Sequence, residues 1–433
     1  THAEHKERFD IVRKLEKKKG IHIAVVADLQ GPKLRVGEFA TGKVLLKEGD
    51  EFLLDMDPKL GTDKRVCLPH KEIFQAIKPG DELLLDDGNI VLTIKKNDSK
   101  TAVTKVKYGG YLSSHKGVNL PNIQLPISAI TEKDREDLKF ALKMGADYVS
   151  LSFVQRADDV KEAKKLVGDK AWIISKLEKP SAIDDLDEII QLSDAIMVAR
   201  GDLGVECPVQ DVPVLQKRIV GKCREYGRPV IVATQMLDSM INNPSPTRAE
   251  VSDVATAVYD GADTVMLSGE TAAGKYPVEA VKMMANIIKK VESDELFLKI
   301  MEKTRKIHCC MNESDAITYA ATHVADVLSR VSAIVTYTTS GLTTLLQAKE
   351  RPSLPILAVT PDINVARRLG IVWGTTSYIN SEKYSSFEKI EEISIKLVKK
   401  EGYAKSGDHI LITAGFPLHK AGRTNILHIV QIP

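Results

Sequence analysis

Hydrophobic and polar positions are spaced in two different ways within the first 119 residues of the chain, before and after about residue 33. Residues 3–18 carry apolar side chains at helical spacing and stop at Gly20, which predicts an amphipathic helix. Residues 22–30, HIAVVADLQ, form an almost continuous apolar run, typical of a buried strand in a parallel sheet. From 33 to 119 the apolar runs are short and are separated by turn sequences such as EGDE and PGDE. This pattern predicts a small all-β module inserted after the first strand.

From about residue 120 the pattern becomes one of strands alternating with helices. Thr131 and Asp134 have the spacing of a capping box in front of the first helix. Such alternation requires a parallel sheet, because each helix returns the chain to the start of the next strand. Strands are predicted at 147–154, 171–178, 195–200, 229–234 and 264–270, and helices at 131–145, 157–168, 181–192, 209–226, 247–260 and 277–293.

With residues 22–30 included, this gives six parallel strands, whereas a (β/α)₈ barrel has eight. The pattern fits either an open six-stranded sheet or a TIM-type barrel whose first two strands lie upstream of Thr1, and the motifs described below favour the barrel. A further alternation near the C-terminus predicts a separate, doubly wound α/β domain. The expected α/β organisation is a barrel domain at 1–32, an inserted β-barrel domain at 33–119, the rest of the barrel at 120–310 and a C-terminal α/β domain at 311–433.

Charge and composition narrow the classes of function. The chain has 61 Lys and Arg against 59 Asp and Glu, a net charge of +2, which argues against nucleic-acid and membrane-surface partners because both need a concentrated basic field. No apolar run is long enough to predict a membrane-spanning helix. The cysteines, Cys67, Cys207, Cys223, Cys309 and Cys310, are odd in number and lack metal-ligand spacing. They favour free thiols in a reducing, cytoplasmic compartment over a disulfide framework.

Polar or charged residues stand at the carboxyl end of every predicted barrel strand, where parallel barrels carry their chemistry. One such residue is commonly part of a surface loop, but six such ends on an otherwise apolar set of strands predict a site. The residues are Asp28, Ser152, Phe153, Lys176, Glu178, Arg200, Gly201, Asp202, Thr234, Ser268, Gly269 and Glu270.

Lys176 and Glu178 are two residues apart on one predicted strand and therefore point to the same side. A metal-holding carboxylate beside a lysine that neutralises a moving phosphoryl group suits phosphoryl transfer, while a buried salt bridge is the alternative reading. Asp202 adds a second carboxylate, and Mg²⁺ commonly takes one or two carboxylates together with phosphate oxygens and water. Gly201 lets the backbone approach an anion at a helix start. Thr234 suits a substrate carboxylate or a proton relay, and equally suits a helix cap.

A second candidate site lies in the C-terminal domain. Thr338, Thr339, Ser340 and Gly341 fall between a predicted strand and a predicted helix, and Thr343 follows in the first helical turn. Hydroxyl and free N–H groups at a helix start suit a phosphate. A capped helix that binds nothing is the alternative reading.

Several motifs resemble the pyruvate kinase family along essentially the whole chain. They are ADLQGPKLR, HKGVNLP, SFV, ISKLE, MVARGDLGVE, VATQMLDSM, NPSPTRAEVSDVATAV and MLSGETAAGKYPVEAV, and the stretch from 194 to 279 is the most specific. The resemblance implies a barrel interrupted by a cap module and followed by an effector domain. It also implies transfer of a phosphoryl group from phosphoenolpyruvate to ADP, giving pyruvate and ATP in the last step of glycolysis, with Mg²⁺ or Mn²⁺ and in a homotetramer.

The resemblance assigns roles to particular residues of this chain. Glu178 and Asp202 resemble the Mg²⁺ ligands, and Lys176 resembles the lysine on the transferring phosphoryl group. Thr234 and Gly201, with Asp202, resemble the groups that hold the phosphoenolpyruvate carboxylate.

The resemblance also assigns roles to residues outside this central group. Asp28 falls in the monovalent-cation region of the family, and Arg35 and Lys116 are similar to its nucleotide-side residues. The loop from Thr338 to Thr343 matches the place of a sugar-phosphate effector.

The chain departs from the family at its monovalent-cation site. An Arg-x-Asn-x-Ser-His-Gly segment, with a phosphate-contacting Arg and the cation-site Asn and Ser, would precede Thr1. The family's Asp-Thr-Lys-Gly-Pro-Glu reads Asp-Leu-Gln-Gly-Pro-Lys at 28–33, so Leu29 offers no hydroxyl and Lys33 stands where an acid is expected. The Lys33 ammonium carries the same charge as K⁺, and family members with this lysine are generally independent of K⁺. We therefore predict that K⁺ is not required, with a solvated loop lysine as the alternative reading.

Three classes of function compete. The first is a pyruvate kinase, and the second is a catalytically impaired paralogue or fragment that acts as a subunit. The third is another barrel enzyme acting on phosphoenolpyruvate or pyruvate, such as a lyase. Retention of Lys176, Glu178 and Asp202 disfavours the second, and a β module over the barrel mouth disfavours the third.

Overall fold

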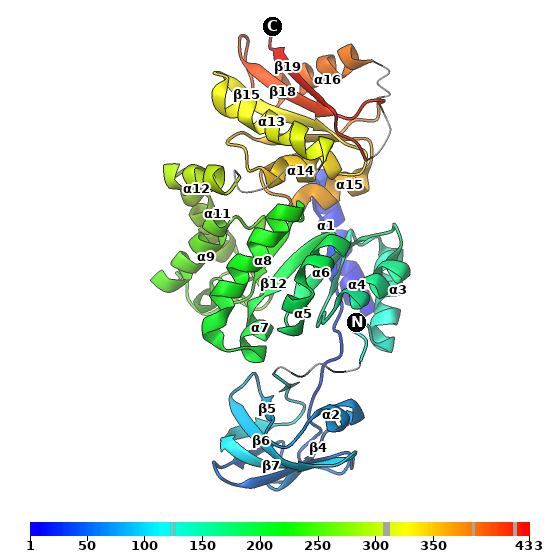
Figure 1. Cartoon of the computed structure of the whole chain (residues 1–433), viewed down its shortest axis with the longest axis vertical. Helices are drawn as coiled ribbons and strands as arrows, with labels where there is room; N and C mark the ends of the chain where they lie inside the picture. The colour runs from blue at the N-terminus through cyan, green and yellow to red at the C-terminus, as the bar shows by residue number, and fades with distance from the viewer. Residues whose placement is uncertain (122, 124, 126, 306–311, 383–385, 419–421) are drawn as a thin grey trace.

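The computed structural model describes the chain from Thr1 to Pro433 apart from residues 122, 124, 126, 306–311, 383–385 and 419–421. Three bodies follow one another along the long axis of the molecule (Figure 1). The β module lies at one end, the parallel sheet with its helices lies in the middle, and the C-terminal domain lies at the other end. The N-terminus is beside the central body, and the C-terminus is at the tip of the C-terminal domain.

The central body is built on six parallel strands that are hydrogen-bonded in chain order. This arrangement confirms the parallel α/β class predicted from the alternating pattern. Within the described residues, β1 pairs only with β10, and β14 pairs only with β13. The strands are β1 (Val26–Asp28), β10 (Tyr148–Leu151), β11 (Trp172–Leu177), β12 (Ala195–Ala199), β13 (Val230–Ala233) and β14 (Thr264–Val265).

The first and last of these strands differ from their predictions. The buried strand expected at 22–30 is a strand only at Val26–Asp28, and Val26 is 37% exposed. The strand expected at 264–270 is reduced to Thr264–Val265, whose side chains are half-buried. Both strands differ because they lie at the edges of the described sheet, where a strand has a neighbour on one side only. They are therefore covered less than β10, β12 and β13, which are fully buried.

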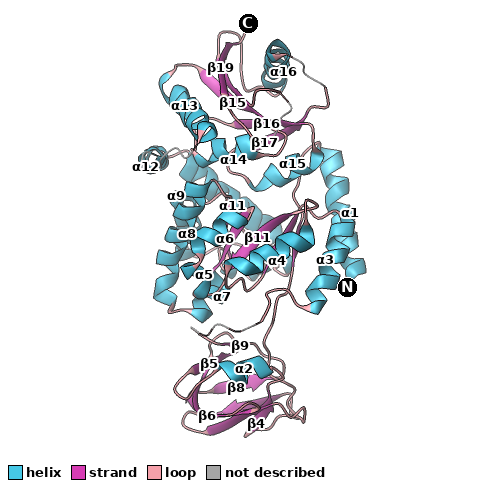
Figure 2. Cartoon of the chain, turned by 45° about the vertical axis from the view of Figure 1, so that its right-hand side comes forward, coloured by secondary structure: helices cyan, strands magenta, loops and turns pink. Residues whose placement is uncertain are grey.

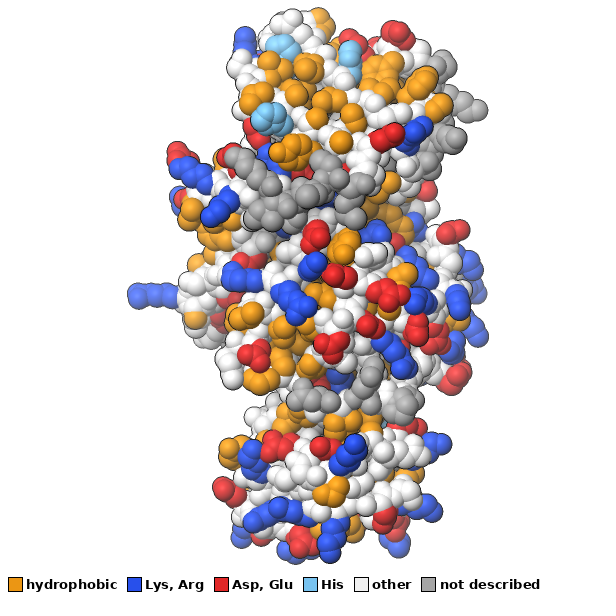
Figure 3. All heavy atoms as spheres, viewed as in Figure 1, with side chains coloured by type: hydrophobic (Ala, Val, Ile, Leu, Met, Phe, Trp, Pro, Cys, Tyr) orange, Lys and Arg blue, Asp and Glu red, His pale blue; other side chains and the backbone are white. Residues whose placement is uncertain are grey.

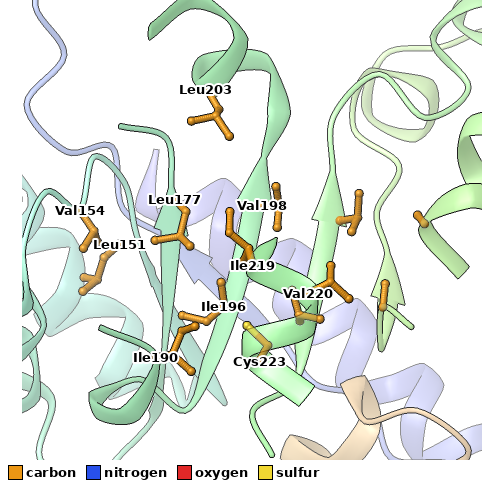
Figure 4. Close-up of a cluster of buried hydrophobic side chains, with 14 of the residues drawn as sticks. Leu151, Val154, Leu177, Ile190, Ile196, Val198, Leu203, Ile219, Val220 and Cys223 are labelled. Atoms are coloured by element: carbon orange, nitrogen blue, oxygen red, sulfur yellow. The ribbon is translucent and has the colours of Figure 1, made fainter. Parts of the chain in front are cut away.

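Helices on the outside of the sheet pack their apolar faces against the strands (Figure 4). Ile196 and Val198 of β12 belong to the same cluster as Ile219 and Val220 of α8, and all four side chains are fully buried. Burying one such side chain contributes roughly 1.5–3 kcal/mol. The predicted helices are α1 (His2–Lys19), α3 (Glu132–Met144), α4 (Ala157–Val167), α5 (Ser181–Asp184) with α6 (Leu186–Leu192), α8 (Val212–Tyr226), α9 (Arg248–Asp260) and α11 (Pro277–Glu292).

Among the described residues of the central body, three α-helices were not predicted. One of them, α7, follows β12 directly and carries Asp202. The unpredicted helices are α7 (Arg200–Glu206), α10 (Gly269–Ala272) and α12 (Glu295–Arg305).

The β module has two sheets around one hydrophobic cluster. Strands β2 and β8 pair with each other, and the other strands form a six-stranded sheet in the order β4-β3-β7-β6-β5-β9. The helix α2 and the strands β8 and β9 are additions to the predicted pattern. The elements are β2 (Lys43–Leu46), β3 (Glu51–Asp55), β4 (Arg65–Cys67), α2 (Lys71–Ala76), β5 (Glu82–Leu85), β6 (Ile90–Asn97), β7 (Thr101–Tyr108), β8 (Gly110–Ser113) and β9 (Val118–Asn119).

The C-terminal domain has a five-stranded sheet in the order β17-β16-β15-β18-β19. Only β19 runs antiparallel, to β18. Helices α14 and α15 lie between this sheet and the central body, and α16 lies at the far end (Figures 1 and 2). The elements are α13 (Glu313–Val327), β15 (Val331–Tyr337), α14 (Leu342–Lys349), β16 (Ile356–Thr360), α15 (Ile363–Arg368), β17 (Thr375–Ile379), α16 (Phe387–Lys400), β18 (His409–Ala414) and β19 (Ile426–Gln431).

The surface matches the balanced charge of the sequence. Basic and acidic side chains are interspersed over the face shown in Figure 3, with no large area of one sign. Among the described helices, none combines the length and the apolar character needed to cross a lipid bilayer.

Candidate active site

Three of the predicted strand-end residues meet around one ammonium group. Lys176 Nζ lies 2.9 Å from Glu178 Oε1 and 3.7 Å from Asp28 Oδ2. It also donates a hydrogen bond to Ser152 Oγ at 2.9 Å. The side chain of Lys176 is 13% exposed and that of Glu178 only 1%, so the pair lies in a largely dry environment. The parallel pairing of β1, β10 and β11 brings these strand ends to the same edge of the sheet.

Burial sets the charge state of this pair. It raises the pKa of Glu178 to about 7, the charge of Asp202 adds to that rise, and Lys176 and the Phe153 N–H group oppose it. The Phe153 N–H donates to Glu178 Oε2 at 2.7 Å. For Lys176, burial alone lowers the pKa, but the charges of Glu178 and Asp28 outweigh it, so its pKa is raised. Lys176 is therefore a cation throughout the physiological range.

The residues predicted to hold a substrate carboxylate also come together. The Gly201 N–H donates to Thr234 Oγ1 at 2.8 Å, which joins the start of α7 to the end of β13. Thr234 has a φ of 69°, a left-handed backbone that is uncommon for a residue other than glycine. Arg200 fixes this corner, since its guanidinium pairs with Asp253 at 2.6 Å and donates to the Thr234 carbonyl at 2.7 Å. Asp202, in the first turn of α7, faces the hollow beside them.

A cavity of about 300 Å³ separates the end of the sheet from the β module. Five residues singled out from the sequence line it, namely Lys33, Arg35, Lys116, Phe153 and Asp202. Lys116 is held by Asp86 at 2.6 Å between Nζ and Oδ1. Arg35 and Lys116, predicted to lie on the nucleotide side, therefore share one cavity with Asp202, a predicted metal ligand.

Arg35 and Lys33 differ in the interactions that fix their positions. The Arg35 guanidinium donates to the His115 carbonyl at 2.6 Å, and its backbone N–H donates to His70 Nε2 at 3.1 Å. Burial lowers the pKa of His70, so the ring is neutral and able to accept this bond. Lys33 is exposed at the rim of the cavity and makes no ion pair within the described part of the chain.

Two carboxylates, Glu178 and Asp202, are those predicted from the sequence to hold a divalent metal ion. Glu178 is buried and feels the charge of Asp202, a repulsion that a bound dication would relieve. No group of three or more His, Cys, Asp or Glu side chains surrounds a metal-sized space in the described residues. The donor set fits Mg²⁺, which completes its shell with water and phosphate oxygens.

Lys179 and Glu206 are among the residues of the cavity wall that were not predicted from the sequence. Glu206 stands four residues after Asp202 and so shares its face of α7. A spacing of four residues indicates a shared face only in a helix, and α7 was not predicted from the sequence.

The second candidate site lies where β15 leads into α14. Thr338 Oγ1 accepts the Gly341 N–H at 2.8 Å, and Thr343 Oγ1 lies 2.7 Å from Thr424 Oγ1, so both hydroxyls have partners and both side chains are buried. Thr339 is half-buried and Ser340 is exposed. Gly341 has a φ of 91°, and a Cβ there would lie 3.1 Å from the Trp172 ring. The loop thus rests on the first residue of β11, the strand that carries Lys176.

Comparison with known proteins covers almost the whole chain. A family model for the barrel domain of pyruvate kinase matches residues 1–281, and a model for the alpha/beta domain of the same family matches residues 315–430. A pyruvate kinase of Agrobacterium vitis is 48% identical over 99% of this chain and 89% of its own length. Those of Methylorubrum extorquens and Clostridium acetobutylicum are 46% and 41% identical, over 98% and 99% of this chain and 88% and 91% of their own lengths.

Proposed function

The chain belongs to the pyruvate kinase family, and we propose that Lys176, Glu178 and Asp202 carry its transfer of a phosphoryl group from phosphoenolpyruvate to ADP. The reaction gives pyruvate and ATP and is the last step of glycolysis. Membership of this family also implies dependence on a divalent metal ion. The observation that carries the assignment is the contact of 2.9 Å between Lys176 Nζ and the buried Glu178 Oε1, at the strand ends beside Asp202.

Lys176 is the residue proposed to act on the moving phosphoryl group. Its charge is fixed by the two carboxylates beside it, and its position is fixed by the bond to Ser152. A preorganised cation in a site that excludes water stabilises negative charge on the transferred group without reorganising during the reaction. In this proposal, most of the rate enhancement by Lys176 therefore comes from the fixed position of its charge.

Glu178 and Asp202 are the residues proposed to hold Mg²⁺ or Mn²⁺. When bound, the ion would neutralise negative charge on the oxygens of the transferred phosphoryl group. The chain's own part is to present two carboxylates at adjacent strand ends and to keep Glu178 fixed through the Phe153 N–H. Thr234 and Gly201, with Asp202, are proposed to position the phosphoenolpyruvate carboxylate beside Lys176, and their contact of 2.8 Å supports this.

Arg35 and Lys116 are proposed to bind the nucleotide, because both line the cavity that opens onto Asp202. Asp28 belongs to the monovalent-cation region in this proposal. We propose that Lys33 takes the place of K⁺, which its position on the rim of the same cavity supports.

Three finer assignments stay proposals. A sugar-phosphate effector at the loop from Thr338 to Thr343 and a homotetramer rest on the family resemblance. A cytoplasmic location rests on the pattern of the cysteines. No observation favours a catalytically impaired subunit, since Lys176 is charged and is held beside both Glu178 and Asp28.

The test of the proposed function is the formation of pyruvate and ATP from phosphoenolpyruvate and ADP with Mg²⁺. Glu178→Ala should reduce kcat by roughly 10²–10⁴, because one of two metal carboxylates is lost. Glu188→Ala, which removes an exposed carboxylate of α6, is the control and should leave kcat unchanged. Near-normal turnover by Glu178→Ala would show that the metal assignment is wrong.

A further inference from the structure

A buried polar cluster joins the β module to the central body, and the proposed chemistry does not use it. The Glu206 carboxylate, at the end of α7, accepts two hydrogen bonds on Oε1. One comes from Asn119 Nδ2 at 2.8 Å and the other from Lys179 Nζ at 2.7 Å. We call these three residues the hinge triad, because Asn119 is the last residue of β9, the final strand of the module before the chain returns to the central body.

Two members of the hinge triad are buried, Asn119 is half-buried, and the triad is incompletely paired. Glu206 is fully buried, and Lys179 is 8% exposed. Glu206 Oε2 is buried without a hydrogen-bond partner among the described residues. A buried ion pair seldom adds stability beyond what apolar side chains would give, but loss of one partner is costly because a buried charge is left uncompensated. Lys179 is the ionic partner of Glu206, and the Asn119 amide is the donor that links this carboxylate to the module.

Two members of the hinge triad are close in sequence to the proposed metal ligands. Lys179 directly follows Glu178, and Glu206 lies one helical turn after Asp202 in α7. On the module side, Asn119 pairs with Leu84 of β5. Figure 2 shows β9 at the end of the module nearest the central body. The triad thus ties the segments that carry both proposed metal carboxylates to the module.

A second contact between the module and α7 lies beside the first. The turn between β5 and β6 reaches α7, since a Cβ built at Gly88 would lie 4.0 Å from the Val205 side chain. Asp87 of that turn and Val205 line the same hollow. Gly88 and Val205 have no polar side-chain atoms, whereas the hydrogen bond of Asn119 fixes a direction between the module and α7.

We propose that the hinge triad sets the position of the β module over the cavity, so that Asn119 and Glu206 are positioning residues for nucleotide binding. The module brings Lys33, Arg35 and Lys116 to the cavity, whereas the proposed phosphoenolpyruvate groups belong to the central body. A shift of the module therefore weakens the hold on ADP and leaves the hold on phosphoenolpyruvate unchanged. This inference rests on the proposed function for the identity of the ligand in the cavity.

The test compares Asn119→Ala and Asn119→Asp with the unaltered chain. Asn119→Ala removes a bond to a charged group and should raise KM for ADP about tenfold, while KM for phosphoenolpyruvate stays within about twofold. Asn119→Asp sets a carboxylate against Glu206 and should raise KM for ADP further, because like charges repel in a buried site. It should also increase the radius of gyration measured by small-angle X-ray scattering. Asn119→Gln, which keeps the amide, should restore part of the affinity for ADP.

Asn97→Ala is the matched control. The Asn97 amide donates to the Phe74 and Ile77 carbonyls, so both of these hydrogen bonds stay inside the module. This variant should lower Tm and leave both KM values unchanged.

Two results would overturn the proposal. One is an equal rise of both KM values in Asn119→Ala, and the other is a lower Tm with no change in KM for ADP. The scattering comparison needs no catalysis, so it reports on the module position even if the chain transferred no phosphoryl group. An Asn119→Asp variant with an unchanged radius of gyration would contradict the proposed role of the triad by itself.

Discussion

At the scale of single residues, the site is a group of charged side chains at one edge of the sheet, and Lys176 and Glu178 are its most buried members. Lys176 has carboxylates on two sides, and Glu178 is almost fully buried. The alternation of side chains along a strand was enough to place Lys176 and Glu178 on one side. The raised pKa of Glu178 was not predictable, since it depends on how deeply the strand end is buried and on the charge of Asp202.

The raised pKa of Glu178 predicts a pH dependence of stability in the metal-free enzyme. The ordinary carboxyl pKa is 4.5, and the folded-state pKa is about 7, so the folded protein binds the extra proton between these values. Stability therefore falls as the pH rises through this window, by on the order of 3 kcal/mol from this group. Urea unfolding of the wild type and Glu178→Gln should show a difference that grows in favour of the variant from pH 5 to pH 7. A difference that stays flat with pH would contradict the assigned pKa.

Lys33 predicts that K⁺ does not activate the enzyme. Its ammonium already supplies one positive charge beside the cavity, and a bound K⁺ would meet like-charge repulsion. The rate should change by less than about twofold when KCl replaces a bulky organic cation at constant ionic strength. Lys33→Glu should move towards K⁺ dependence. Strong activation of the unaltered enzyme by K⁺ would refute the role given to Lys33.

At the scale of elements, caps and turns decide where the site residues lie. Helix α7 was missed because Gly201 and Gly204 lower helix propensity within seven residues. The structure stabilises it by tertiary contacts, namely the bond from Gly201 to Thr234 and the fully buried Leu203. By contrast, α3 was predictable because its capping box is local in sequence.

The Asp134 carboxylate caps helix α3 and also binds the segment that follows β1. Besides the Thr131 N–H and hydroxyl, its carboxylate accepts the N–H groups of Gln30 and Gly31, in the segment that leads from β1 to the module. Asp134→Ala should lower the free energy of unfolding by about 2–4 kcal/mol, because buried N–H groups lose their acceptor. Thr131→Ala, which removes only the cap hydroxyl, should cost about 1 kcal/mol. Equal losses in urea unfolding would show that the contacts to Gln30 and Gly31 contribute nothing.

At the scale of the whole molecule, the order of the three bodies along the chain was predictable from the sequence. The contacts that join these bodies were not. The change from short β runs to strand–helix alternation marked the module, and the second alternation marked the C-terminal domain. The joints depend on residues far apart in sequence, such as Arg367, which contacts Glu16 of α1 at 2.7 Å, and Tyr148, whose hydroxyl donates to the Arg368 carbonyl. The antiparallel direction of β19 was likewise invisible in its apolar pattern.

The loop of the C-terminal domain predicts a response to sugar phosphates. Gly341 rests against Trp172, which begins β11, and Lys176 lies near the other end of that strand. Binding at the loop therefore has a short physical route to the site. A sugar phosphate should activate the wild type, and Thr339→Glu should abolish the activation because a carboxylate repels phosphate. Identical activation curves for the two proteins would discard this site.

The measurement that tests the central claim most directly is the turnover of Lys176→Met with saturating phosphoenolpyruvate, ADP and Mg²⁺. Methionine fills much of the same space but has no charge, so kcat should fall by roughly 10³ or more, while binding of Mg²⁺ changes little. Lys164→Met, which removes a lysine of α4 that pairs with Asp194, should retain wild-type turnover. If Lys176→Met made pyruvate and ATP within tenfold of the wild-type rate, the charge at the strand ends would not be the source of catalysis.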